Sequence, residues 1–275
     1  MAADGGLLAD RVAVVTGGGG GIGRGISERF AAEGAAVALV EIDEARAAET
    51  VATIAGAGHR AVAVVADVRE PEGVEQAHAA TIDAFGRIDV LVNNVGHYGG
   101  PRRAFHEQDD DEWNELYRVN FQHVMRMSRA ALPSMLEHGR GAIVNVSTVE
   151  AFRAIPTRAV YSGFKSAISG FTRSLAIEYA HAGIRVNAVA PDVTETIQVP
   201  YARLVPPEQR SLIPTWVPLG RFGQPADVAA VVLFLASDLA GFVTGVSVPV
   251  DGGTLAAGGW YPTGDGGWTN RPRNP

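Results

Sequence analysis

One stretch near the amino terminus limits the folds open to this chain more than any other. Residues 11–43 contain a short apolar run at 12–15, a glycine-dense turn at 17–23, and a segment at 22–33 whose apolar side chains recur at helical spacing. This order predicts a strand, a tight turn and a helix. Because the turn lacks side chains, its backbone can approach a bulky anion while the first N–H groups of the helix point at that anion. The stretch therefore predicts a binding site for a diphosphate.

A second apolar run at residues 37–40 ends on Glu41, which follows Gly23 by 18 positions. A carboxylate at that distance can accept hydrogen bonds from the ribose of an adenosine. A glycine-rich turn alone is often only a tight loop, but a strand before it, a helix after it and this acid together favour a dinucleotide site. The acid also favours a ribose that carries no phosphate.

Composition and charge exclude several classes of protein. The chain has 275 residues, 47% of them hydrophobic, which is enough for the core of one α/β domain. Its net charge of -7, without a basic run, argues against a nucleic-acid partner. The absence of cysteine excludes disulfides and thiolate metal sites. Neither a secretory signal nor a membrane-spanning run of about 18 apolar residues is present, so a cytoplasmic protein without membrane attachment is expected.

Beyond Glu41, strand-like and helix-like segments alternate along the chain. This alternation predicts a Rossmann-type, doubly wound parallel sheet of about seven strands, with helices on both faces, in a single α/β domain. The further strands are expected at residues 61–65, 88–92, 142–146, 185–190 and 246–250. The further helices are expected at residues 45–55, 71–85, 111–137 with a break near Pro133, 161–180 and 226–236.

Two segments do not fit the alternation. Residues 194–222 are rich in proline and apolar side chains and follow the carboxyl end of a strand, where open α/β sheets bind ligands, so they are expected to form a substrate loop. We therefore divide the chain into a dinucleotide-binding domain at 1–253, which includes this loop, and a tail rich in Gly, Trp and Pro at 254–275. The composition of the tail allows either a mobile segment or one that lies across another surface.

Candidate catalytic residues follow from spacing. Tyr161 and Lys165 are four residues apart on an expected helix, so both side chains emerge on one face. A nearby ammonium favours the phenolate and is expected to lower the pKa of the phenol, which would make it a proton donor and acceptor near neutral pH. Such a pair is usually only a surface feature of a helix. Two further observations favour a catalytic pair. A strand end that carries hydroxyl groups, 145–148, precedes it, and Asn120 lies inside a long helix, where an amide side chain does not favour helix formation.

Taken together, the motifs resemble the short-chain dehydrogenase/reductase family over about residues 7–254. The residues that carry the resemblance are Thr16-Gly17-x-x-x-Gly21-Ile22-Gly23, Asp67-Val68, Asn93-Asn94-Val95-Gly96, Asn120, Tyr161-x-x-x-Lys165, Leu219-Gly220-Arg221 and Asp251-Gly252-Gly253. The resemblance implies the fold described above, a nicotinamide cofactor, and the reversible oxidation of an alcohol to a carbonyl, commonly in a homotetramer.

The resemblance also implies catalytic roles. Tyr161 would be the general acid/base, Lys165 would hold the nicotinamide ribose and bias Tyr161, and Asn120 would position a water in the proton relay. The family's hydroxyl residue lies 13 positions before the tyrosine, a count that ends on Thr148. Consecutive strand residues point to opposite faces, so only one of Ser147 and Thr148 can address the substrate, and we choose Thr148.

Further residues are expected to bind the cofactor. Gly17, Gly21, Ile22 and Gly23 would hold the diphosphate, Asp67 and Val68 the adenine, and Asn94, Val95 and Gly96 the adenosine side. Pro191 would also bind the cofactor, together with Tyr161 and Lys165, and Thr194 and Thr196 would contact the carboxamide or the diphosphate. Asp192 stands where the family usually has glycine. An aspartate adopts the backbone conformation that glycine allows there less readily, and its charge would lie near the nicotinamide. Glu41 would repel a 2′-phosphate, and neither Gly20 nor Ile42 is basic, so NAD is expected rather than NADP. No metal site is expected.

These residues predict an NAD-dependent oxidoreductase that interconverts a secondary alcohol and a ketone. Apolar side chains in the substrate loop favour an apolar or ring-bearing small molecule, steroid-like or terpenoid-like. The contacts of Glu150 and Arg153, with the substrate or with solvent, are open. One alternative is a 3-oxoacyl thioester reductase acting on an acyl-carrier-protein substrate. Another, from a different class, is a non-catalytic dinucleotide-sensing protein.

Overall fold

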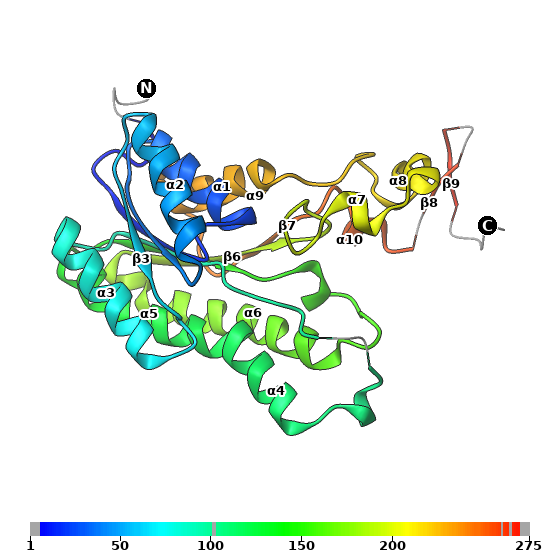
Figure 1. The fold of residues 1–275 in the computed structure, drawn as a ribbon, viewed down its shortest axis with the longest axis horizontal. Helices are drawn as coiled ribbons and strands as arrows, with labels where there is room; N and C mark the ends of the chain where they lie inside the picture. The colour runs from blue at the N-terminus through cyan, green and yellow to red at the C-terminus, as the bar shows by residue number, and fades with distance from the viewer. Residues whose placement is uncertain (1–5, 101–102, 260, 264–265, 270–275) are drawn as a thin grey trace.

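The apolar runs of the sequence form one parallel sheet in a computed structural model that describes residues 6–100, 103–259, 261–263 and 266–269 (Figure 1). The sheet has seven strands in the order β3-β2-β1-β4-β5-β6-β7, and every neighbouring pair is parallel. This confirms the predicted sheet. The strands are β1 (Val12–Thr16), β2 (Ala36–Glu41), β3 (Ala61–Val65), β4 (Val90–Asn93), β5 (Gly141–Val146), β6 (Ile184–Pro191) and β7 (Ser247–Val250).

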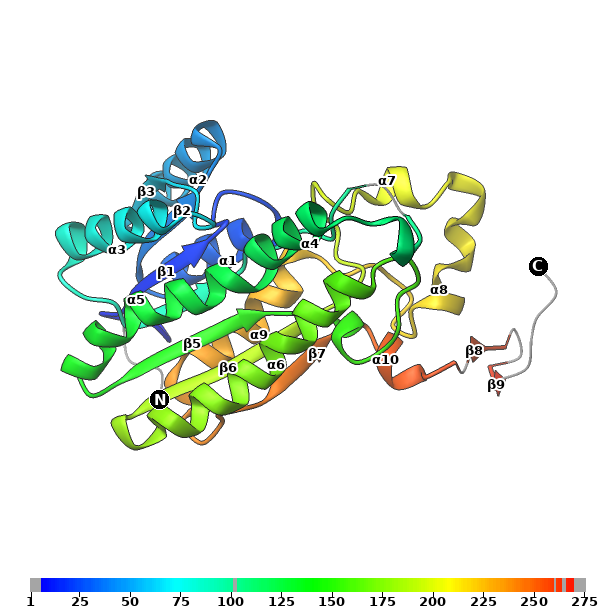
Figure 2. The same ribbon diagram turned by 90° about the horizontal axis from the view of Figure 1, so that it is seen from below.

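Helices cover both faces of the sheet (Figures 1 and 2). One face carries α1 (Gly21–Ala32), α2 (Glu44–Gly56) and α9 (Pro225–Ala236), and the other carries α3 (Pro71–Phe85), α5 (His123–Glu137) and α6 (Ala159–Tyr179). Consecutive strand residues serve opposite cores: Val15 packs with Phe30 of α1, whereas Val14 packs with Met135 of α5. This is why the strands are apolar throughout instead of alternating.

The strand order reverses between β1 and β4, so the loops after these two strands diverge and leave a crevice between them. Asn94, just past β4, ties the two strand ends together: its backbone N donates to Thr16 Oγ1 at 2.9 Å and its Nδ2 to Thr16 O at 3.0 Å. Open α/β sheets bind ligands at such a reversal. The predicted glycine turn leaves β1 at this point.

The long helix predicted at 111–137 is interrupted, but not at Pro133. It consists of α4 (Asp110–Tyr117), a π-helical segment (Arg118–Gln122) and α5, and Pro133 lies inside α5. The interruption has a local cause, since Nδ2 of Asn120 donates to the carbonyl of Leu116 at 3.0 Å and so competes with the backbone ladder one turn earlier. The predicted position of the break was therefore wrong.

The substrate loop has its own structure. It contains α7 (Tyr201–Leu204), a 3₁₀ turn at Pro207–Leu212 and α8 (Ile213–Trp216). Val205, Ile213, Val217 and Phe222 form a small separate core, and Tyr201 and Trp216 pack edge-on against Phe222. Much of the apolar content that was expected to face a ligand therefore holds the loop together. The side chain of Leu204 lies outside the described residues.

Shorter elements complete the chain. Single 3₁₀ turns lie at Phe105–Glu107, Val149–Ala151, Ala180–Ala182 and Asp238–Ala240. The tail begins with α10 (Thr254–Ala257) and continues into an antiparallel pair, β8 (Tyr261–Pro262) and β9 (Trp268–Thr269), which extends past α8 away from the sheet (Figure 2). Trp260 and residues 270–275 of the predicted tail lie outside the described residues. None of the helices described is long and apolar enough to cross a membrane.

Candidate active site

A cavity of about 450 Å³ opens at the carboxyl edge of the sheet, where the strand order reverses. Most residues predicted to bind a dinucleotide line it. They are Gly17, Gly21, Ile22, Glu41, Asp67, Val68, Asn94, Val95, Gly96, Tyr161, Lys165, Thr194 and Thr196. Gly23, Asn120, Thr148 and Pro191 lie behind this wall, outside the lining.

The glycine turn has the shape that a diphosphate requires. Gly17 adopts a positive φ of 63°, and a Cβ on Gly23 would lie 2.0 Å from the carbonyl oxygen of Gly17, so a side chain at Gly23 would force the turn apart. Helix α1 starts at Gly21, has no acidic residue in its first turn, and receives no side-chain cap from the described residues. Its first N–H groups thus remain available to an anion.

Glu41, at the end of β2, lines the cavity and is almost fully buried. Its carboxylate accepts hydrogen bonds from the backbone N of Gly19 (3.3 Å), Ile42 (3.0 Å) and Asp43 (3.2 Å), and from Nη2 of Arg46 (3.2 Å). These contacts fix the acid in the position that the sequence predicted.

Arg46 is a cavity residue that the sequence analysis missed. Asp43 caps α2 by accepting from the backbone N of Arg46 at 3.0 Å, and this places Arg46 in the first turn, facing the glycine turn. An aspartate before a helical run is a recognisable cap, so that signal was present in the sequence. The guanidinium offsets part of the negative charge of Glu41.

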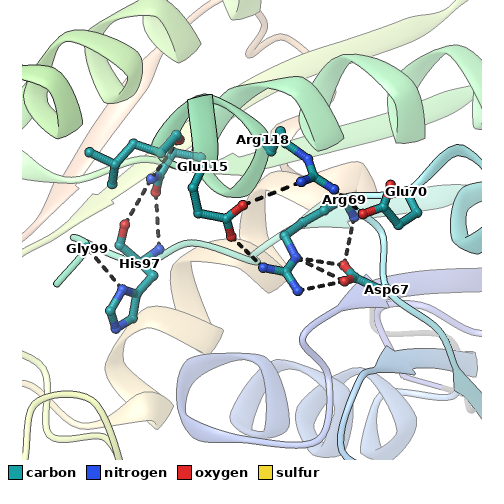
Figure 3. Close-up of polar contacts among 9 residues, drawn as sticks. Asp67, Arg69, Glu70, His97, Gly99, Glu115 and Arg118 are labelled. Carbon is teal, nitrogen blue, oxygen red and sulfur yellow. Dashed lines mark hydrogen bonds and ion pairs between the residues drawn. The ribbon is translucent and has the colours of Figure 1, made fainter. Parts of the chain in front are cut away.

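Asp67 lines the cavity and belongs to an ion-pair network that links the cavity wall to α4 (Figure 3). Nε and Nη2 of Arg69 donate to the Asp67 carboxylate, with Nη2 at 2.7 Å, and this pairing holds the pKa of Asp67 below its usual value. Arg69 also pairs with Glu115 of α4, and Arg118 at the start of the π-helical segment pairs with Glu70. The pairing of this segment with α4 could not be predicted, because Glu115 and Arg118 are 46 and 48 positions away from Arg69 and Glu70, respectively, in the chain.

The end of the cavity that holds Tyr161 and Lys165 is formed by α6 and by the end of β5. Lys165 is 3% exposed, and its Nζ donates to the carbonyl of Val146 at 3.1 Å and lies 6.0 Å from the centre of the Tyr161 ring. The hydroxyl of Thr148 lies close enough to the phenol of Tyr161 to act on its pKa in the lowering direction. The hydroxyl of Ser147 instead donates to the backbone carbonyl of Lys165 at 3.0 Å, although Ser147 does line the cavity.

Asn120 is fully buried and clasps the backbone of His97. Its Nδ2 donates to His97 O at 2.9 Å, and its Oδ1 accepts from His97 N at 3.1 Å. A Cβ on Gly96 would lie 2.7 Å from Nζ of Lys165 and 3.3 Å from Oδ1 of Asn120, so a side chain there would displace the Lys165 ammonium. The fold therefore brings the amide of Asn120, the ammonium of Lys165 and the phenol of Tyr161 to one end of the cavity.

The expected lowering of the Tyr161 pKa is wrong for this arrangement. Burial disfavours the phenolate and raises the pKa of Tyr161 to about 12; the hydroxyl of Thr148 acts in the lowering direction, and the charge of Glu150 adds to the rise. The Lys165 ammonium is directed to Val146 O, and burial lowers the pKa of Lys165 to about 8. Lys165 is also the only lysine in the sequence.

Asp192 adopts an ordinary negative φ, so the absence of glycine imposes no left-handed strain there. It is 8% exposed on its side chain and lines the cavity. Its Oδ2 accepts from Nη2 of Arg153 at 2.9 Å and from Oγ1 of Thr254 at 2.5 Å, and Arg153 also donates to Glu150 at 3.0 Å. Glu150 and Arg153 are thus joined to the cavity wall through Asp192.

The substrate loop crosses the cavity toward the segment after β4. The hydroxyl of Tyr98 donates to Gln198 O at 3.3 Å, and Nε2 of Gln198 donates to Gly96 O at 3.2 Å. A second cavity of about 490 Å³ shares His97, Tyr98 and Tyr161 with the first and continues along α4. Within the described residues, no group of three or more His, Asp or Glu side chains is arranged to hold a metal ion.

Comparison with known proteins gives relatives that match over nearly the full chain. A family model described as enoyl-(acyl carrier protein) reductase matches residues 17–254. A 2,5-dichloro-2,5-cyclohexadiene-1,4-diol dehydrogenase of Sphingobium indicum is 36% identical over 248 residues, which are 90% of this chain and 96% of the relative. A cis-4-hydroxycyclohexanecarboxylate dehydrogenase of Sinomonas cyclohexanicum is 38% identical over 249 residues, 90% of this chain and 98% of the relative.

A solved structure, that of levodione reductase, superposes with a TM-score of 0.84 and 35% sequence identity, and the match covers 91% of this chain and 99% of the other. The relatives named here are oxidoreductases, and several act on CH–OH groups according to their names. The fold and the family predicted from the motifs are both confirmed by these matches. The chain belongs to the short-chain dehydrogenase/reductase family of nicotinamide-dependent oxidoreductases.

Proposed function

We propose that this protein is an NAD-dependent oxidoreductase that interconverts a ring-bearing secondary alcohol and the corresponding ketone. The observation that carries the proposal is the meeting of Tyr161 and Lys165 at one end of a cavity whose other end has an open glycine turn, with the Thr148 hydroxyl beside the phenol just behind the cavity wall. When bound, the dinucleotide would supply the acceptor or donor of hydride. The side chains of the protein would then transfer the proton and position the substrate.

Tyr161 is the proposed acid/base. In the oxidative direction the Tyr161 oxygen would accept the proton of the substrate hydroxyl, the bound dinucleotide would supply the hydride acceptor, and the product would be the ketone. Thr148, whose hydroxyl lies near that phenol, is the proposed holder of the substrate oxygen. Because burial alone keeps Tyr161 protonated, the phenolate needs nearby positive charge, and Lys165 is the cationic side chain placed to supply it. Asn120 is the proposed holder of the relay water, next to Lys165.

Cofactor choice is proposed from charge at the adenosine end. Glu41 is buried, and its carboxylate is fixed by three backbone N–H groups, so it cannot easily turn away from a 2′-phosphate. Arg46 offsets this charge, but Asp43 shares the same guanidinium, so the local balance stays negative. NAD is therefore the proposed cofactor over NADP.

The substrate class is proposed from the relatives and from the cavity walls. Two of the relatives have names that specify six-membered ring alcohols. In this chain, Tyr98, Ile197 and Val199 present apolar surface beside the reaction end. Ring-bearing alcohols, steroid-like or terpenoid-like ones included, are the proposed substrates.

The proposed function is tested by following the absorbance of reduced nicotinamide with NAD or NADP and a panel of cyclic and acyclic secondary alcohols. We expect turnover of cyclic alcohols with a lower Michaelis constant for NAD than for NADP. Turnover only with NADPH and a 3-oxoacyl thioester would favour the acyl-carrier-protein reductase that remains as an alternative. Cofactor binding without turnover of any substrate would favour a dinucleotide sensor.

Assembly and location form part of the same proposal. Phe242 and Leu239 after α9 and Ile177 on α6 expose large apolar side chains on two different elements. Two such surfaces can bury themselves against other copies about two axes, which supports a homotetramer. A cytoplasmic location is proposed because the reaction draws on the NAD pool.

A further inference from the structure

Three charged side chains from separate segments meet near the reaction end of the cavity. Glu150 lies in the 3₁₀ turn after β5, Arg153 follows that turn, and Asp192 follows β6. Nη2 of Arg153 joins the two carboxylates, at 3.0 Å from Glu150 and 2.9 Å from Asp192. Because β5 and β6 are neighbours, with Ser147 N bonded to Val189 O, this cluster lies beside the strand end that carries Thr148.

Within the cluster, Asp192 is the member that reaches the cavity. Its side chain lines the same wall as Tyr161 and Lys165, whereas Glu150 and Arg153 stand behind it. One guanidinium serves two carboxylates, so the cluster keeps one negative charge in excess. Thr254 donates to the same oxygen of Asp192 as Arg153 does, which fixes the carboxylate without neutralising it.

The ligand proposed for this end of the cavity changes charge during the reaction. The nicotinamide ring is cationic when oxidised and neutral when reduced, so a fixed buried carboxylate attracts only the oxidised form. We propose that Asp192 makes this site bind the oxidised dinucleotide more tightly than the reduced one, and that Arg153 opposes this preference. The inference rests on the proposed function and adds to it the direction in which the reaction is favoured.

That direction is alcohol oxidation. In a mixed pool of both cofactor forms, a carboxylate at the nicotinamide end raises the fraction of the protein that carries the oxidised form. The reduced product has a neutral ring and gains no such attraction, so it is held less tightly relative to the oxidised form. Both effects favour an enzyme that starts from an alcohol and releases a ketone, although they leave the overall equilibrium of the reaction unchanged.

The test compares dissociation constants of NAD⁺ and NADH, measured by calorimetric titration of the intact protein without substrate. Asp192→Asn keeps the shape and removes the charge, so the ratio of the NADH constant to the NAD⁺ constant should fall about tenfold, or about 1.4 kcal/mol. Arg153→Met leaves both carboxylates without their partner and should raise the ratio. If the two variants change the ratio in opposite directions although the residues are in contact, the effect is due to charge and not to a shared loss of structure. The ratio cancels any general loss of affinity that either variant causes.

Two matched variants control the experiment. Thr254→Val removes a hydrogen bond to Asp192 without changing charge, and Glu137→Gln removes an exposed charge far from the cluster; both should leave the ratio as in the native protein. The inference is overturned if Asp192→Asn leaves the ratio unchanged or if Asp192→Asn and Arg153→Met move it in the same direction. Failure of both cofactor forms to bind the native protein would instead contradict the proposed function.

Discussion

At the scale of single residues, the informative feature is the choice between lysine and arginine. Every other strongly basic side chain in this sequence is an arginine, and the one lysine stands at 165. Arginine stays charged at any accessible pH, whereas a buried lysine can lose its proton. Lys165 is 3% exposed, and burial lowers its pKa to about 8. The position therefore uses a property that arginine lacks.

The single lysine allows a direct measurement. With carbon-13-labelled lysine, the native protein should give one side-chain ε-carbon resonance that titrates near pH 8 instead of near 10.5. Because the folded pKa lies below the unfolded one, the cost of burying the ammonium is fully present below pH 8. It is relieved as the pH rises toward 10.5, by up to about 3 kcal/mol. Lys165→Met should lack this rise in unfolding free energy; titration of the native resonance near 10.5 would contradict the account.

Ser147 and Thr148 give a second prediction at this scale. Thr148→Val keeps the side-chain shape but removes the hydroxyl that lies near the Tyr161 phenol, and it should lower kcat about 100- to 1000-fold, as the loss of one donor at a reacting oxygen does. Ser147→Ala removes a bond to the carbonyl of Lys165 and should lower kcat much less. The reverse order of the two variants would transfer the catalytic role to Ser147.

At the scale of elements, the π-helical segment shows what the sequence could and could not predict. The strands, helices and glycine turn follow from apolar periodicity and were predicted close to their observed bounds. The break in the long helix was not, because it depends on a side chain that competes with its own backbone, which periodicity does not register. The same limit applies to the Asp67–Arg69–Glu115 network and to the Asp192–Arg153 pair, which join segments far apart in the chain.

Asn120 links this helical irregularity to the cavity, so replacing Asn120 should change both the stability of the fold and the binding of the cofactor. Asn120→Ala leaves the N–H and carbonyl of His97 without their partners, so we expect a loss of about 1–3 kcal/mol in the free energy of unfolding by urea and weaker NADH binding. Asn120→Asp keeps the acceptor for His97 N but faces the carbonyls of His97 and Leu116 with an oxygen, so it should be destabilised as well. The idea fails if Asn120→Ala is as stable as the native protein.

At the scale of the whole molecule, one sheet edge collects contributions from most of the chain. Strands β1, β4, β5 and β6 each end at the cavity, so residues from 17 to 199 meet there although no short motif contains them. The residues of the motifs were predictable because each follows a strand end. The apolar substrate loop was less predictable, since part of it packs on itself around Phe222.

The exposed apolar surfaces predict an assembly that can be measured. Light scattering on the eluting protein should give the mass of four chains of 28.8 kDa each. Ile177→Asp on α6 and Phe242→Asp after α9 should each disrupt one of two contacts, so each variant alone should elute as a dimer. A native protein that elutes as a monomer at micromolar concentration would contradict the proposed tetramer.

The central claim is that Tyr161 moves the proton while the cavity holds the dinucleotide. It is tested most directly by comparing native protein and Tyr161→Phe in two measurements, NADH binding and NAD-dependent oxidation of the best cyclic alcohol from the panel. The account predicts that Tyr161→Phe binds NADH within a few-fold of the native affinity and loses at least about 1000-fold in kcat. Retention of native turnover by Tyr161→Phe would contradict it.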